Sequence, residues 1–134
     1  MAHGNMDVPG GRTKRMGMSF EKLRVYQAAE LLDAEVQRLI ARMPSGHGSD
    51  VDHLRRAVAS LLYNIAEAYG CSSPGRKCNH LEVSRGSSDE ARAILRRLVA
   101  RGALPQHVIE KAGNLTRAIA KMLGSWLSSL ERRK

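Results

Sequence analysis

The pattern that decides the fold lies near the end of the chain, where residues 105–130 read PQHVIEKAGNLTRAIAKMLGSWLSSL. Apolar residues return at alternating spacings of four and three, as Val108, Ala112, Leu115, Ile119, Met122 and Trp126. This spacing places them on one side of an α-helix. A second apolar row lies beside the first, at Ala120, Leu123, Leu127 and Leu130.

The two rows together are wider than the stripe of about three positions in seven that one bundle core needs. Surplus apolar surface predicts an oligomer. The residues that we expect at its interface are Leu123, Trp126, Leu127 and Leu130. The alternative is that they fill the end of the monomer's own core.

The fourth helix is thus predicted at residues 105–130, and three more are predicted upstream, at about residues 20–43, 50–69 and 80–101. The stripe expected to face the core is Val51, Leu54, Val58, Leu61, Ile65 and Ala68 in the second helix, and Leu81, Ser84, Ser88, Ala91, Leu95 and Leu98 in the third. Pro44 to Gly48 separates the first two, a loop from Cys71 to Asn79 precedes the third, and Gly102 with Pro105 marks the last hairpin. Helices of matching length predict an all-α, antiparallel up-down-up-down four-helix bundle at residues 19–134. Residues 1–18 lack a hydrophobic period, which predicts a flexible, disordered tail.

Charge is concentrated in the second half of the chain. Residues 1–70 carry 9 Lys and Arg against 8 Asp and Glu, whereas residues 71–134 carry 13 against 5, within a total of +9. Arg outnumbers Lys by 16 to 6, and a guanidinium matches a phosphate with two hydrogen bonds. We therefore predict contact with an RNA or DNA backbone, although a merely solvated surface is the alternative. The predicted contact residues are Arg76, Lys77, Arg85, Arg92, Arg96, Arg97, Arg101, Arg117, Lys121, Arg132 and Arg133.

Polar residues also interrupt the apolar segments of the second and third helices. Their spacing places them beside the core stripe, which predicts a structural hydrogen-bonded network between the two helices. Its expected members are Arg56, Ser60, Asn64, Glu67, Ser87 and Glu90. In the enzymatic alternative, Glu67 and Glu90 would form a catalytic or metal-binding pair. Neither is followed three residues later by His, as a di-iron site would require, so we predict a protein that is not an enzyme.

The two cysteines suggest no cofactor. Cys71, Cys78 and His80 have a spacing unlike that of zinc knuckles and supply only three ligands, so free surface thiols are expected. Two cysteines without a secretory pattern favour a cytoplasmic location. No apolar run is long enough to span a membrane.

Several motifs occur in the order that a known bacterial family shows: FEKLRVYQAA at 20–29, RRA at 55–57, NIAE at 64–67 and GSSDE at 86–90. With these motifs the chain resembles the four-helix bundle family called 23S rRNA intervening-sequence proteins. The resemblance implies a homopentamer arranged as a ring or barrel. Some members resemble the accessory protein of diversity-generating retroelements, which implies a reverse transcriptase as a partner. Ala68 departs from the family's usual Gly, and Asn79 and His80 replace an aromatic region.

Overall fold

The computed structural model describes residues 19–132, so the predicted tail and Arg133 lie outside the described residues. Four α-helices make up most of it: α1 (Arg24–Ala41), α2 (Gly48–Gly70), α3 (Pro74–Ala100) and α4 (Glu110–Glu131). Two short 3-10 helices, η1 (Phe20–Lys22) and η2 (Gln106–Ile109), precede α1 and α4. Residues 19–132 contain no β-strand.

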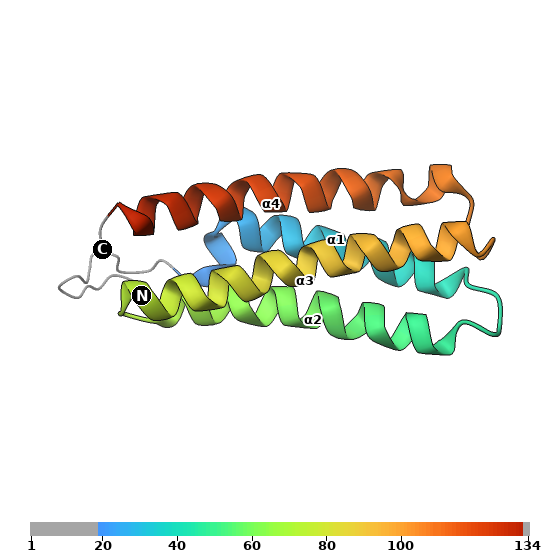
Figure 1. The fold of residues 1–134 in the computed structure, drawn as a ribbon, viewed down its shortest axis with the longest axis horizontal. Coiled ribbons are helices and arrows are strands. Elements are labelled where there is room, and N and C mark those ends of the chain that lie inside the picture. Colours follow the sequence, from blue (N-terminus) through green and yellow to red (C-terminus); the bar gives the residue numbers. More distant parts are fainter. Residues whose placement is uncertain (1–18, 133–134) are drawn as a thin grey trace, which may run out of the picture.

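Consecutive helices run in opposite directions along one long axis (Figure 1). Every residue of the predicted stripe in α2 is buried, from Val51 to Ala68, and so are the predicted core positions of α3. The largest fully buried side chains come from all four helices, including Leu32, Leu61, Leu95 and Ile119. The predicted four-helix bundle is confirmed.

The predicted start of the third helix at residue 80 is wrong, because α3 begins at Pro74. Ser73 is extended, and its hydroxyl accepts a hydrogen bond from the backbone N–H of Arg76. Pro74 fits the next position because a proline lacks the N–H that a first helical turn leaves unpaired. The segment predicted as a loop therefore contains the first turn of α3.

The predicted start of the fourth helix at residue 105 is also wrong, because Pro105 is extended, residues 106–109 form η2, and α4 begins at Glu110. The remaining helix ends agree more closely with the predictions. Gly102 has a φ of +79°, and its N–H bonds to the carbonyl of Val99 while that of Ala103 bonds to Leu98. This pair of bonds is a Schellman motif, which ends α3 where the sequence predicted. The first predicted helix is divided, because Leu23 adopts an extended conformation between η1 and α1.

The two apolar rows of α4 both serve the monomer. Leu123, Leu127 and Leu130 are buried in the core of the single chain. Leu115, Met122 and Trp126 are only partly buried and pack against that core from its edge. The prediction that Leu123, Leu127 and Leu130 lie at an oligomer interface is therefore wrong, because packing within the single chain already buries them. Trp126 alone of the four predicted residues keeps some exposed surface.

Candidate nucleic-acid interface

A hydrogen-bonded network joins α2 to α3, as predicted for three of its members. The hydroxyl of Ser87 donates to that of Ser60 at 2.8 Å, and the amide nitrogen of Asn64 donates to the Ser60 carbonyl at 2.9 Å. His80 adds a fourth member, because its Nδ1 lies 2.9 Å from the amide oxygen of Asn64. That oxygen only accepts, so His80 is the donor. The network fixes α2 against α3.

The other three predicted members do not join this network. Arg56 and Glu67 are exposed and have neither a hydrogen bond nor an ion pair from their side chains within residues 19–132. Glu90 instead contacts Nε2 of His53 on the outside of the α2–α3 pair. Glu67 and Glu90 are therefore not a carboxylate pair. His53 lies seven residues before Ser60, so helical spacing could have placed it on the side of α2 that faces α3.

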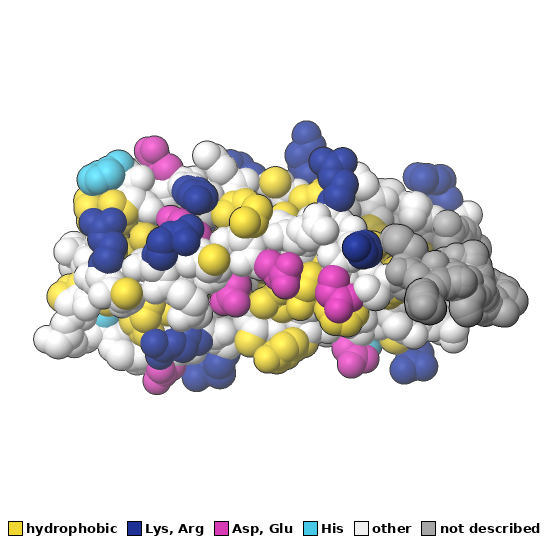
Figure 2. All heavy atoms as spheres, turned by 180° about the vertical axis from the view of Figure 1, so that it is seen from behind, with side chains coloured by type: hydrophobic (Ala, Val, Ile, Leu, Met, Phe, Trp, Pro, Cys, Tyr) yellow, Lys and Arg dark blue, Asp and Glu magenta, His cyan; other side chains and the backbone are white. Residues whose placement is uncertain are grey.

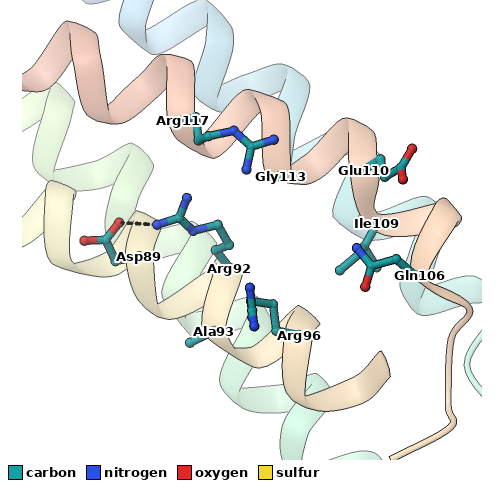
Figure 3. A pocket seen from close by; sticks show the side chains of 9 residues that line it. All are labelled: Asp89, Arg92, Ala93, Arg96, Gln106, Ile109, Glu110, Gly113 and Arg117. Atoms are coloured by element: carbon teal, nitrogen blue, oxygen red, sulfur yellow. Dashed lines mark ion pairs between the residues drawn. The ribbon is translucent and has the colours of Figure 1, made fainter. Parts of the chain in front are cut away.

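A basic hollow of the surface lies between α3 and α4, with Glu110 and Asp89 also in its lining. Its volume is about 520 Å³, and Figure 3 shows Arg92 and Arg96 rising from α3 opposite Arg117 on α4. Gly113 forms part of the lining, and a Cβ atom added there would meet the Arg117 guanidinium at 3.8 Å. Asp89 lies 3.8 Å from Arg92 and offsets part of the positive charge.

The same interhelical groove continues toward the C-terminus of α4. A second hollow there is lined by Arg85 of α3 together with Lys121, Gly124 and Arg132 of the α4 end. Glu82 pairs with Arg85 at 2.8 Å. Along α4 the lining residues Gly124, Ser125 and Ser128 are small, which keeps the groove open. The α3–α4 groove therefore collects six of the predicted contact residues: Arg85, Arg92, Arg96, Arg117, Lys121 and Arg132.

The remaining predicted contact residues do not line this groove. Arg97 and Arg101 both bind the carboxylate of Asp50, at 3.2 and 3.1 Å, and so tie the end of α3 to the start of α2. Lys77 donates to the carbonyls of Ala68 and Tyr69, where it caps the C-terminus of α2. Arg76 is exposed at the same hairpin, beside a separate cleft. Arg97, Arg101 and Lys77 are therefore structural cations, distinct from those that line the groove.

The comparison with protein families connects this bundle to a named group. The family model described as "23S rRNA-intervening sequence protein" matches residues 21–125. The chain belongs to this family. The match extends from η1 into α4 and includes both sides of the first hollow.

A solved structure is similar to this intervening-sequence family protein. It is a protein of unknown function from the S23 ribosomal protein family of Bacteroides thetaiotaomicron, with a TM-score of 0.70 and 19% sequence identity. The alignment covers 77% of this chain and 97% of the other. At this identity the likeness shows a shared fold. No curated protein matches the chain.

Two further findings concern metals and membranes in this family member. Cys71 and Cys78 are free but buried, in contrast to the predicted surface thiols. Among residues 19–132, no three His, Cys, Asp or Glu side chains are grouped in a way that could hold a metal ion. Within the same residues, every helix is too short or too polar to cross a bilayer.

Proposed function

We propose that this protein binds the sugar-phosphate backbone of RNA or DNA in the α3–α4 groove, as a non-enzymatic, self-associating bundle. The observation that carries the proposal is the convergence of Arg92 and Arg96 with Arg117 across the groove. Arginines on two facing helices can contact successive phosphates, because each guanidinium forms paired hydrogen bonds with phosphate oxygens. Within residues 19–132, no aromatic side chain on which a base could stack lines the groove, so binding is expected to be independent of sequence.

The test is filter binding to structured RNA and to duplex DNA across a salt series. The variant R92Q/R96Q/R117Q should bind about tenfold or more weakly at low salt, and the slope of log K against log salt should fall by about 0.9 for each lost phosphate contact. A matched control is R42Q/R55Q/R56Q, which removes the same charge from exposed arginines that lie just after α1 and on α2. Undetectable binding at low salt, or equal losses in both variants, would contradict the proposal.

A second candidate is a protein-interaction scaffold without nucleic-acid binding. It is favoured by large apolar side chains that the bundle leaves exposed, namely Leu31, Tyr63 and Val83. Pull-down from a lysate with and without nuclease separates the two candidates. Partners retained after nuclease treatment support the scaffold, whereas partners lost support nucleic-acid binding.

The homopentamer and the reverse transcriptase partner stay predictions that come from the family resemblance. Sedimentation equilibrium at micromolar concentration tests the first, because a pentamer has five times the monomer mass. Co-purification with a reverse transcriptase encoded nearby tests the second. If the protein is a monomer and still binds duplex DNA, the binding proposal is supported and the assembly prediction is wrong.

A further inference from the structure

An exposed aromatic surface lies across α1 and α2, outside the α3–α4 groove. Tyr63 of α2 is 69% exposed, more than any other large hydrophobic side chain of the described residues. Phe20 and Tyr26 contact each other edge to face, with 4.9 Å between ring centroids. The short helix η1, which carries Phe20, packs against both α1 and α2. Tyr63 lies near enough to Tyr26 to raise the pKa of its hydroxyl, so three of the chain's five aromatic residues lie on this surface.

Carboxylates accompany these rings. Glu30 and Asp33 lie four and seven residues after Tyr26 on α1, so they share its side of the helix. Burial raises the pKa of Tyr26, and the negative charges of Glu30, Glu21 and Asp33 raise it further, in agreement with this placement. Neither Glu30 nor Asp33 forms an ion pair within residues 19–132. Their charge is therefore not neutralised by a neighbouring side chain.

The face of the molecule turned away from the viewer in Figure 1 differs from the rest of the surface. Figure 2 shows acidic side chains grouped along its middle, next to hydrophobic ones, with Lys and Arg mainly toward the edges. Because carboxylates repel a polyanion, the acidic middle of this face is suited to a cationic ligand.

We infer that the α1–α2 surface of Tyr26, Tyr63, Glu30 and Asp33 docks an arginine-rich segment of a partner protein. A guanidinium stacks on the face of an aromatic ring and forms an ion pair with a carboxylate. A surface that has both aromatic rings and carboxylates without an ion-pair partner therefore offers both interactions to an arginine. The inference is independent of the proposed nucleic-acid binding, because it uses another face and a ligand of opposite charge.

Fluorescence anisotropy with a short labelled peptide of alternating arginine and alanine tests this inference on the full chain. The wild-type protein should bind the peptide at low salt, although its net positive charge repels such a ligand elsewhere on the surface. Tyr63→Ala should weaken binding about two- to fivefold, the range for one exposed cation–π contact, whereas Tyr63→Phe keeps the ring and should bind as wild type does. The double variant E30Q/D33N should weaken binding about fivefold at low salt and flatten its salt dependence.

Val83→Ala is the matched control, because Val83 is 49% exposed on α3 and Ala truncates a side chain outside the surface. Circular dichroism confirms that each variant is folded before its affinity is compared. The inference is overturned when the wild-type protein does not bind the peptide, or when Tyr63→Ala and Val83→Ala bind alike. It is also overturned when sedimentation shows that Tyr63→Ala abolishes self-association without changing peptide binding, which would assign the surface to a second copy of the chain.

Discussion

At the scale of single residues, the α2–α3 network determines how two helices meet. Asn64 stands at its centre, between the carbonyl of Ser60 and the ring of His80. Asn64→Ala should lower the free energy of unfolding by about 1 to 2 kcal/mol, because it leaves Nδ1 of the partly buried His80 without its hydrogen bond. Urea unfolding measures this loss. The control is Asn79→Ala at an exposed position of α3, whose side chain has no hydrogen bond within residues 19–132, and equal losses in the two variants would show that the network adds no stability.

Two buried serines of α3 offer a contrast of the same kind. The hydroxyl of Ser84 lies 3.3 Å from the Leu61 carbonyl, whereas that of Ser88 is buried without a hydrogen-bond partner among the described residues. Ser84→Ala should therefore destabilise the bundle by about 1 kcal/mol, and Ser88→Ala should leave it unchanged or stabilise it by up to about 1 kcal/mol. Urea midpoints of the two variants give the comparison. A loss in Ser88→Ala as large as that in Ser84→Ala would contradict this account.

At the scale of helices, hydrophobic spacing predicted the bundle because each core stripe repeats within one helix. Every predicted position of the α2 and α3 stripes is buried, since local periodicity sets these positions, although Ala57, Cys78 and Ile94 are buried beside them and were not predicted. The start of α3 was missed because its first turn has little apolar pattern, and Gly75 resembles a loop residue. The Ser73-Pro74 pair was the available signal. Sequence spacing within helices could not show that Glu90 contacts His53, because that contact depends on the rotation of two helices against each other.

The cap of α3 supports a prediction at this scale. Ser73→Ala removes the only side-chain hydrogen bond that caps an α-helix N-terminus in residues 19–132, and should lower the free energy of unfolding by about 1 kcal/mol. The change is measured by urea unfolding. Ser72→Ala, one residue earlier and exposed, is the control and should stay within about 0.5 kcal/mol of wild type. A loss in both variants would show that the hairpin, not the cap, is sensitive.

At the scale of the whole molecule, charge is divided between faces in a way that composition does not reveal. The count of basic residues in the second half of the chain was correct, but it treated all of them alike. The fold pairs Arg97 and Arg101 with the single carboxylate of Asp50 and uses Lys77 as a helix cap, while it places six other cations along one groove. Only the packing of α3 against α4 creates this difference.

A groove of converging arginines is destabilised by its own repulsion, so an anion that binds it should stabilise the folded state. A ligand at ten times its Kd adds about 1.4 kcal/mol, which corresponds to a rise in Tm of roughly 4 to 7 °C for a chain of this size. We therefore expect pyrophosphate to raise Tm more than sodium chloride does at equal ionic strength. Differential scanning fluorimetry measures both.

The arginine variants decide whether that stabilisation belongs to the groove. R92Q/R96Q/R117Q should have a higher Tm than wild type at low salt, because mutual repulsion is relieved, and should lose the additional effect of pyrophosphate. R42Q/R55Q/R56Q should keep that effect, since its arginines lie on α2 and at the end of α1. If pyrophosphate and chloride raise Tm equally in the wild-type protein, both salts act only by screening the charge of the groove. The arginines on its two helices then do not act together on a phosphate.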